Sequence, residues 1–526
     1  MSFDAVVVGA GPAGVFAAES LAGARVCVLD VGTPPPQKGG ELQRNQYDLK
    51  QSGEDLFAPL IGERFESLHN VHRNYLSPKL KGPRMRYVTE RWRELGNVDV
   101  DGFDPMMSFA TGGLANAWGA GAYRFTDDEL RDFPIDAGDL AVHYDALTSH
   151  IGITGTDDDL APFVGSSRDC QPVHRMNRLG QLLARRYDRH RAHFHRHGIH
   201  IGAPRMAVLS CAHRGRPAYD YQGLEFFQGH IPSIYNPAFT LAELVREGRV
   251  EHRTGRLVER FETDEHGVRV FARDVATGEV QIVRARRLVL AAGALNTARI
   301  VLRSRGDGET RLPLLDNPIS YVPFVTLRLI GRGLERESLP LQLTVVCRDE
   351  LEPVPIFASF YGVSATLWND LLFDLPLSAR DNIRMLKHLL PAMSVVQLFY
   401  PDHARPENHV RLLDDGRTRL VYRGRQLGRL ERRMIRAFRR AGFFGWPSLC
   451  KYPDAGNSFH YAGCLPMRGS SPGPFETDAD GRLGGEGPVF VADAATFPSL
   501  PSKNLTLTIM ANARRIGARV RDGLVE

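Results

Sequence analysis

The N-terminal glycine pattern constrains the fold more than any other feature of this 526-residue chain. A short apolar run, Val6 to Val8, is typical of a buried parallel strand. The motif Gly9-x-Gly11-x-x-Gly14 follows it directly. Gly9 permits a tight turn, Gly11 lets the backbone approach a pyrophosphate, and Gly14 lets a helix pack closely on the strand. The helix N-terminus offers N–H donors to phosphates, so the pattern predicts a dinucleotide-binding βαβ unit.

A second strand and an acid complete this unit. Residues 13–21 are expected to form the helix, and residues 25–29 the next strand, which ends in Asp30. The acid stands at about the distance at which a carboxylate meets the adenosine ribose hydroxyl. Pro12 and Ala13 belong to the same predicted phosphate loop. The alternative is a glycine-rich turn in an ordinary α/β unit, but the order of strand, helix, strand and acid favours a cofactor site.

Two further segments favour FAD over NAD. Residues 287–295 are typical of a buried strand that ends in a glycine turn and returns the chain to the nucleotide fold. Residues 111–119 form a glycine-rich loop that carries one amide, Asn116, and one indole, Trp118. A soluble NAD enzyme has no obvious use for either segment. For Trp118, core packing beside the cofactor is the favoured interpretation.

Size and composition indicate an ordinary globular protein with two or more lobes. The hydrophobic content is 43%, the charged content is 24% and the formal net charge is only +5. No nucleic-acid motif is present, so nucleic acid is not expected as a partner. No apolar run is long enough to span a bilayer, and no signal peptide is expected before the first strand. The six scattered cysteines favour a reduced, cytoplasmic protein.

The C-terminal region carries the most specific pattern of the chain. It combines a histidine, a glycine-rich turn with an aspartate, a Phe-Pro pair and an asparagine at the start of the last helix. In chain order the elements are His460, Gly481-Arg482, Asp493-Ala494-Ala495, Phe497-Pro498, Pro501, Asn504 and Thr506-Leu507-Thr508.

With this block, the chain resembles the glucose–methanol–choline (GMC) flavin oxidoreductases. The resemblance covers the N-terminal motif, the loop at Gly112, residues 289–295 and nearly all of residues 455–512. It implies an FAD enzyme that oxidises an alcohol CH–OH group of a small molecule to a carbonyl. It also implies that oxygen or another acceptor takes up the electrons.

The roles of family residues carry over by position. The resemblance implies that His460 is the catalytic base and Asn504 its partner, that Asn116 touches the flavin, and that Asp493 binds the ribityl and phosphate region. No metal ligand is expected. The expected cofactor contacts are Gly9, Gly11, Pro12, Ala13, Gly14, Asp30, Gly112, Gly113, Asn116, Ala117, Val258, Ala292, Gly293, Asp493, Ala494, Leu505 and Thr506.

The chain departs from the family pattern at three places. Leu505 stands where a proline usually follows the catalytic asparagine. Residues 464–467 read Cys-Leu-Pro-Met where threonine, cysteine, arginine and methionine are usual. Ala117 occupies the position at which some relatives attach FAD through a histidine, so non-covalent FAD is predicted. These departures weaken the transfer of a substrate or of oxygen reactivity, but they leave the His/Asn pair intact.

The chemistry of the pair suits alcohol oxidation. Histidine can take the hydroxyl proton because its pKa lies near the working pH, while the flavin N5 takes the hydride. Asn504 can donate to the substrate oxygen as negative charge develops there. The alternatives are a structural loop histidine for His460 and a helix cap for Asn504. A loose likeness of residues 112–144 to sugar-oxidising members suggests a sugar, a cyclitol or a glycosylated natural product.

Three rival functions remain open at this stage. Some family members are lyases that bind FAD and cleave cyanohydrins without net redox change. A non-catalytic protein with a structural flavin is a second rival, against which the intact His/Asn pair argues. A flavin monooxygenase is the third, and it would require NAD(P)H.

The predicted fold class is α/β, with a discontinuous Rossmann-like FAD-binding domain and a mixed-sheet substrate-binding lobe. The FAD domain is expected to comprise residues 1–150, including a cover over 31–104, and residues 240–300 and 455–526. The substrate lobe is expected to comprise residues 151–239 and 301–454. Expected strands are 250–263, 268–274, 321–329, 341–347 and 393–399, and expected helices are 381–390 and 506–520.

Two polar segments have unremarkable interpretations. A basic helix over residues 423–440 suits a membrane or a polyanion, but a solvated helix face is the favoured interpretation. The histidines at 190, 193, 195, 197 and 200 also invite a metal, because the first, second and fourth would share one helix face. Interleaved arginines and a single nearby acid, Asp188, favour a solvated polar segment instead.

Overall fold

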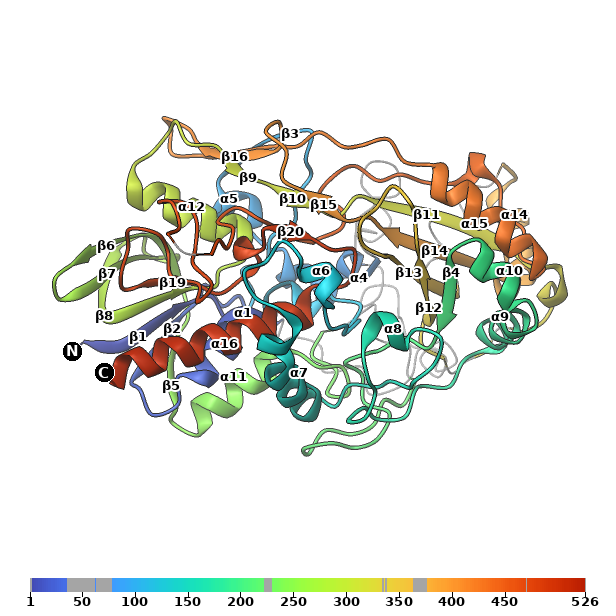
Figure 1. Cartoon of the computed structure of the whole chain (residues 1–526), viewed down its shortest axis with the longest axis horizontal. Coiled ribbons are helices and arrows are strands. Elements are labelled where there is room, and N and C mark those ends of the chain that lie inside the picture. Colours follow the sequence, from blue (N-terminus) through green and yellow to red (C-terminus); the bar gives the residue numbers. More distant parts are fainter. Residues whose placement is uncertain are drawn as a thin grey trace.

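A computed structural model describes most of the chain (Figure 1). The described residues are 2–35, 62, 78–221, 229–333, 335, 338–362, 376–469 and 471–525. The predicted cover over 31–104 lies largely outside them, and the description resumes with α4 (Pro78–Lys81), η1 (Pro83–Val88) and α5 (Trp92–Gly96). Among the described residues, no helix has the length and apolar character needed to cross a membrane.

The N-terminal strand lies in a Rossmann-like sheet, at the left of Figure 1. This confirms the predicted α/β class. Its parallel part runs in the order β5 (Val250–Arg253), β2 (Val26–Leu29), β1 (Phe3–Val8) and β8 (Val280–Leu290), with β19 (Val489–Val491) also parallel to β8. The strands β7 (Gly267–Asp274) and β6 (Arg256–Asp264) extend β8 as an antiparallel ribbon. The expected strand 250–263 is thus two strands, separated at Gly255, which has φ +71°.

Both faces of this sheet are buried, which explains the continuous apolar run at its N-terminal strand. Ala5 and Val7 pack with α1 (Pro12–Ser20), α11 (Pro237–Arg246) and α16 (Thr506–Val525). Val6 and Val8 point the other way and pack with α12 (Ala294–Arg305) and the β6–β7 ribbon. Helix α16 is the predicted last helix, and it lies along α1 in Figure 1.

A second sheet forms the opposite end of the molecule in Figure 1. Its order is β11 (Ile319–Val325), β14 (Met393–Phe399), β13 (Ile356–Gly362), β12 (Leu341–Cys347) and β4 (Ile199–Gly202). Every described pair is antiparallel, so the expectation of a mixed sheet in this lobe is wrong. The expected strand 321–329 ends at Val325, and the 3₁₀ turn η3 (Leu327–Leu329) follows.

Helices cover one face of this second sheet. They include α9 (Arg178–Arg189), α10 (Arg191–Arg196) and α15 (Arg429–Arg440), and α14 (Ala379–Leu389) lies nearby in the chain. Helix α15 begins after Gly428, six residues later than the basic run predicts. It buries an apolar stripe that includes Phe438, whose ring stacks on Phe324 at 4.8 Å. Alternate residues of the same strands face the other way and remain available for a site.

Three small sheets join the two ends. They are β10 (Leu315–Asp316) with β18 (Tyr461–Ala462), β15 (Asp402–His403) with β20 (Ser499–Leu500), and β3 (Val98–Asp101) with β17 (Thr418–Val421), β16 (His409–Leu412) and β9 (Leu312–Pro313). Because β3 and β17 pair in parallel, a segment of the predicted FAD domain shares a sheet with a segment of the predicted substrate lobe. The division into domains stays a prediction.

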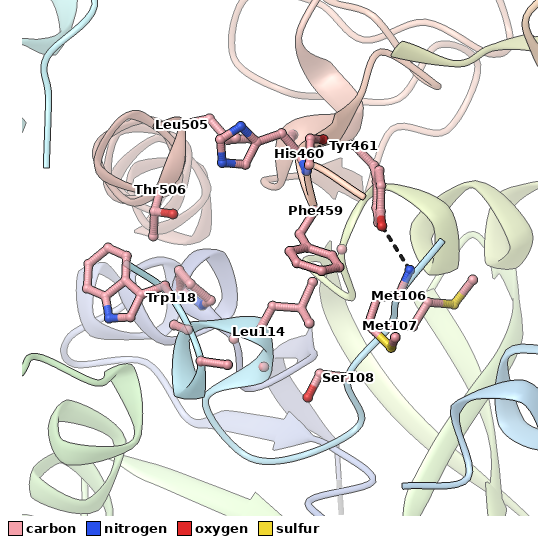
Figure 2. A pocket seen from close by; sticks show the side chains of 18 of the residues that line it. Met106, Met107, Ser108, Leu114, Trp118, Phe459, His460, Tyr461, Leu505 and Thr506 are labelled. Atoms are coloured by element: carbon pink, nitrogen blue, oxygen red, sulfur yellow. Dashed lines mark hydrogen bonds between the residues drawn. The ribbon is translucent and has the colours of Figure 1, made fainter. Parts of the chain in front are cut away.

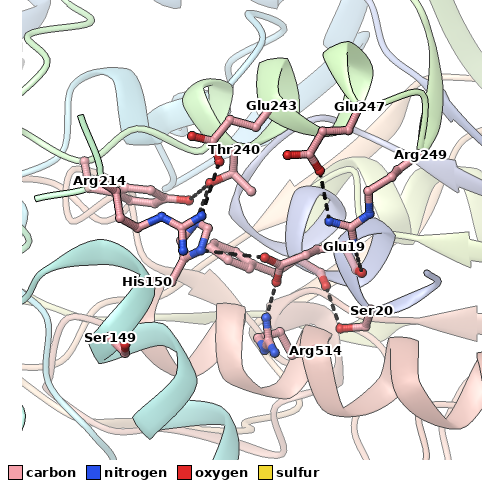
Figure 3. Close-up of polar contacts among 12 residues, drawn as sticks. Glu19, Ser20, Ser149, His150, Arg214, Thr240, Glu243, Glu247, Arg249 and Arg514 are labelled. Atoms are coloured by element: carbon pink, nitrogen blue, oxygen red, sulfur yellow. Dashed lines mark hydrogen bonds and ion pairs between the residues drawn. The ribbon is translucent and has the colours of Figure 1, made fainter. Parts of the chain in front are cut away.

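A polar network fastens the helices below the Rossmann sheet (Figure 3). Glu19 at the end of α1 forms an ion pair with Arg514 of α16. Its other oxygen lies 3.8 Å from His150 Nδ1 of α7 (Ala137–Ile151). The ring of His150 reaches Thr240 of α11 through Nε2 at 2.9 Å. Glu19 therefore connects three of the four helices in this layer directly and the fourth through one histidine.

We expect the substitution Glu19→Gln to destabilise this layer, because Arg514 would lose its charged partner in a largely buried setting. The expected loss is about 1–3 kcal/mol of unfolding free energy. The measurement is the melting temperature at one fixed scan rate. Glu247→Gln is the matched control, since Glu247 pairs with Arg249 while 49% exposed and such pairs contribute little. Equal melting temperatures for both variants would contradict the prediction.

Candidate active site

One large cavity lies where the Rossmann sheet meets the antiparallel sheet. Its volume is about 750 Å³. On one side it is lined by the residues that follow the parallel strands, such as Gly9 after β1, Asp30 after β2 and Ala291 after β8. Crevices at the carboxyl ends of parallel strands are where open α/β sheets bind ligands. On the other side it is lined by Tyr321, Pro323, Tyr361, Val395, Gln397 and Phe399 of the antiparallel sheet.

The cavity brings together nearly all residues expected from the sequence. Both proposed catalytic residues, His460 and Asn504, line it. Of the expected cofactor contacts, Gly14, Gly112 and Asn116 do not line it. The other expected cofactor contacts line the cavity: Gly9, Gly11, Pro12, Ala13, Asp30, Gly113, Ala117, Val258, Ala292, Gly293, Asp493, Ala494, Leu505 and Thr506. Their contact with a cofactor stays a prediction.

The three glycines of the N-terminal motif have three different surroundings. Gly9 has φ +101°, and a Cβ there would lie 2.6 Å from the Ala291 carbonyl oxygen. A Cβ on Gly14 would lie 1.9 Å from the Gly9 carbonyl oxygen, so α1 can pack on β1 only with glycine at this position. A Cβ on Gly11 would meet nothing within 4 Å. The open space at Gly11 adjoins the N-terminus of α1, which suits a pyrophosphate.

Asp493 joins the two glycine turns at the cavity floor. Its Oδ2 accepts hydrogen bonds from the Gly293 N–H (2.8 Å) and the Thr297 hydroxyl (2.5 Å), and its Oδ1 accepts one from the Ala495 N–H (2.9 Å). Burial raises the pKa of this carboxyl to about 6. Asp493 therefore holds the end of β8 against the end of β19, whether or not it also contacts a cofactor.

The side chain of Asn116 is hydrogen-bonded to residues in and around the glycine loop. Its Nδ2 donates to the carbonyls of Thr111 and Gly113, at 3.0 and 2.7 Å. Its Oδ1 accepts from Tyr87, His230 and Asn236, at 3.1, 2.8 and 2.8 Å. The side chain is 8% exposed. Because both ends of the amide are hydrogen-bonded within the protein, Asn116 shapes the glycine loop, and its contact with the flavin stays a prediction.

A short strand pair positions His460. In β10 and β18, Leu315 pairs with Ala462 and Asp316 with Tyr461. The next pair in this antiparallel register is Asn317 and His460, and the His460 Nδ1 lies 2.9 Å from Asn317 Oδ1. The ring of Phe399 stacks on the imidazole with centroids 5.1 Å apart. Asn317 was not predicted, because a strand of two residues has no recognisable period.

The amide of Asn317 fixes which nitrogen of His460 carries the proton. Its Nδ2 donates to the carbonyls of Tyr400 (2.8 Å) and Pro501 (3.2 Å), so its Oδ1 must face His460. An oxygen can only accept, so His460 Nδ1 carries the hydrogen and Nε2 carries the lone pair. Burial lowers the pKa of His460 to about 3. The imidazole is therefore neutral at physiological pH, and its Nε2 is an acceptor with no partner among the described residues.

The turn before His460 is strained and enclosed (Figure 2). Phe459 has φ +61°, a region that a bulky residue rarely adopts. The hydroxyl of Tyr461 accepts a hydrogen bond from the Met106 N–H at 2.8 Å. Figure 2 shows Phe459 and His460 facing the same space as Leu114 and Trp118. Strain of this kind persists only where surrounding contacts hold the chain in place, and it is typical of functional sites.

Two residues that precede Asn504 hold its segment in place. Pro501 accepts the hydrogen bond from Asn317, and Lys503 is buried with its ammonium donating to Glu129, Arg124 O and Phe163 O at 2.5, 2.8 and 2.6 Å. The Asn504 amide itself has no hydrogen-bond partner among the described residues. A Cβ on Gly121 would lie 2.6 Å from Asn504 Oδ1, so glycine makes the room for this amide. These contacts were not predicted, because the partners of Pro501 and Lys503 lie far from Asn504 in the sequence.

Comparisons with known proteins agree with this site. A sequence model described as "GMC oxidoreductase" matches residues 445–513, which contain His460 and Asn504. The chain is 24% identical to a 6'''-hydroxyparomomycin C oxidase of Streptomyces lividus, over 95% of this chain and 91% of that protein. It is 25% identical to a C-glycoside 3-oxidase of Microbacterium trichothecenolyticum, over 98% and 96%. A solved structure of pyridoxine 4-oxidase from Mesorbium loti has the same fold, with a TM-score of 0.59 and 15% identity over 98% of both chains.

The fold and the site thus define a flavoprotein oxidoreductase. Residues 445–513 match the GMC oxidoreductase family, and the comparisons support an enzyme that acts on CH–OH donors. The family implies FAD as the cofactor, and an alcohol substrate and an electron acceptor are typical of it. The open space at Gly11, the N-terminus of α1 and the size of the cavity fit such a group.

The glycine geometry predicts opposite outcomes for two similar substitutions. Gly11→Ala should leave the fold intact but weaken FAD binding, because its methyl enters only open space at the phosphate loop. Gly9→Ala should destabilise the fold itself, because it adds a backbone clash at positive φ. The measurements are the melting temperature of the FAD-free protein and the dissociation constant of FAD. Unchanged FAD affinity in Gly11→Ala would contradict the assignment of this loop.

Proposed function

We propose that the enzyme oxidises a CH–OH group on a sugar, a cyclitol or a glycosylated natural product to a carbonyl, with non-covalent FAD. The observation that carries the proposal is the neutral His460, whose free Nε2 belongs to the same cavity as the glycine loop. Ala117 lines the cavity and offers no nucleophile for a covalent link, which supports non-covalent binding. Oxygen or another acceptor would take up the electrons.

His460 is the proposed base. Its Nε2 accepts the proton from the substrate hydroxyl, and FAD, when bound, accepts the hydride from the carbinol carbon. The C–H electron pair leaves with the hydride, and a C=O bond forms as the O–H bond breaks. The imidazolium that results has both nitrogens protonated, and its Nδ1–H keeps the hydrogen bond to Asn317. Asn317 is therefore a positioning residue that presents Nε2 rather than Nδ1 to the substrate.

Asn504 is the proposed donor to the substrate oxygen. Its amide lines the cavity without a partner among the described residues, so it can donate there without breaking a bond in the protein. The substrate oxygen becomes more negative as its proton leaves. A prepositioned donor therefore stabilises the transition state more than the ground state.

The antiparallel sheet supports a glycoside-like substrate. The cavity wall presents the rings of Tyr321, Tyr361 and Phe399, together with the amide of Gln397. Gln397 Nε2 donates to the Tyr321 hydroxyl at 3.2 Å, and the two residues are cross-strand partners. Aromatic faces can cover the C–H surface of a sugar ring while polar tips bond its hydroxyls. The names of two full-length relatives, an aminoglycoside-type oxidase and a C-glycoside oxidase, agree with this class.

We expect His460→Ala to retain FAD and to slow its anaerobic reduction by substrate about 100- to 10,000-fold, the usual contribution of a general base. The measurement is single-turnover bleaching of the flavin absorption by stopped flow. His403→Ala, a substitution at a surface histidine that is 48% exposed, is the control and should reduce flavin at the wild-type rate. A reduction rate in His460→Ala within a few-fold of the wild type would refute His460 as the base.

The pH profile tests the role of Asn317. The active form has neutral His460, so kcat/KM should be constant above the pKa of His460 and fall only at acidic pH. In Asn317→Asp a carboxylate would face Nδ1–H and raise the pKa of His460 by about 1–3 pH units. The acid limb of the profile should then move to higher pH. Asn317→Leu should lower kcat/KM at all pH values without that movement, and superimposable profiles for Asp and wild type would contradict the role.

A further inference from the structure

A second cluster of chemically capable side chains lies outside the flavin cavity. It comprises Asp159, which precedes α8 (Ala161–Val164), His195 of α10 and His200 of β4. One ligand atom of each lies within 4.8 Å of the other two. His195 Nε2 is 2.8 Å and His200 Nδ1 is 3.2 Å from the same oxygen, Asp159 Oδ2. None of the three lines the cavity, and α10 and β4 lie at the far end of the molecule from the Rossmann sheet (Figure 1).

We propose that Asp159, His195 and His200 form a binding site for Zn²⁺. Two imidazoles and one carboxylate are a common protein ligand set for zinc, with a fourth position left for water. Zinc binds nitrogen and oxygen at about 2.0–2.2 Å, so its ligand atoms lie about 3.3–3.5 Å apart. The observed separations of 2.8 and 3.2 Å need only a small outward movement to accept the ion.

Neighbouring aromatic residues hold these three side chains in place. The Tyr187 hydroxyl of α9 donates to Asp159 Oδ2 and lies 3.1 Å from His195 Nε2, so it orients the carboxylate. The imidazoles of His195 and His200 lie 4.4 Å apart, and the ring of Phe163 packs against His200 at 5.0 Å.

Accessibility and charge are also compatible with an ion. The side chains of Asp159 and His200 are 19% and 20% exposed, and that of His195 is 37% exposed, so the site is reachable from solvent. Arg191 and Arg348 lie close enough to act on these groups electrostatically. The guanidinium of Arg191 is paired with Asp188 at 2.6 Å, which offsets part of its repulsion toward a cation.

The structure revises the interpretation of the histidine-rich segment. His190 ends α9, and α10 starts at Arg191, so His190, His193 and His197 do not share the face of one helix. The rings of His193 and His197 are tilted at 43° with centroids 4.6 Å apart, and neither residue belongs to a possible metal-binding group among the described residues. The acid that completes the cluster comes from position 159, more than thirty residues earlier in the chain.

The test is zinc binding to the purified FAD-loaded enzyme after metal removal with a chelator and dialysis. Isothermal titration with zinc chloride should give one site per chain for the wild type. Asp159→Asn and His195→Ala should each weaken this site at least about tenfold, as expected for loss of a ligand. His193→Ala and His197→Ala are matched controls and should bind zinc as the wild type does. Calcium should not compete, because it prefers all-oxygen sites.

Melting temperature provides an independent reading. Saturating zinc should raise it in the wild type and in the His193→Ala control, and should leave it unchanged in Asp159→Asn and His195→Ala. The flavin spectrum and the zinc-free melting temperature report whether a variant is folded. If one of the ligand variants is not folded, His200→Asn is tested in its place. No zinc binding by the wild type, or a site lost in His193→Ala but kept in His195→Ala, would overturn the proposal.

Discussion

The close approach of two backbones at the end of β1 determines much of this structure. At Gly9 a side chain would collide with the carbonyl of Ala291 beyond β8, and at Gly14 it would collide with the carbonyl of Gly9. Because neither side chain exists, the turn after β1, the N-terminus of α1 and the turn after β8 meet at one edge of the sheet. Asp493 adds the turn after β19 through three hydrogen bonds. The cavity is the space that this edge leaves open.

A few buried hydrogen bonds hold the catalytic side of the cavity. One amide, Asn317, bonds His460 with its oxygen and the Tyr400 and Pro501 carbonyls with its nitrogen. It therefore fixes the tautomer of His460 and connects that residue to the segment that carries Asn504. Lys503 anchors the same segment, because its ammonium donates three hydrogen bonds to protein acceptors. The two proposed catalytic residues are thus held by backbone register and buried polar bonds rather than by each other.

Local patterns in the sequence were sufficient for features that depend on short stretches of chain. The apolar run before Gly9, the strands 341–347 and 393–399 and the last helix all lie where the pattern predicts them. Features that depend on pairing between distant segments were not accessible. Asn317 faces His460 only because of the register of two-residue strands, and Asp159 meets His195 only because a loop packs beside β4. Asn116 illustrates the same limit, since its five hydrogen-bond partners in the protein could not be predicted from its residue type.

The most direct test of the central claim is the anaerobic titration of the FAD-loaded wild-type enzyme with a panel of glycosides, cyclitols and simple alcohols. The visible flavin absorption is followed throughout. The account predicts that the absorption bleaches with one class of hydroxylated substrate, and more slowly when the reacting carbinol carbon carries deuterium. A flavin that stays oxidised with every alcohol, or a protein that cannot be loaded with FAD, would contradict the assignment of this cavity.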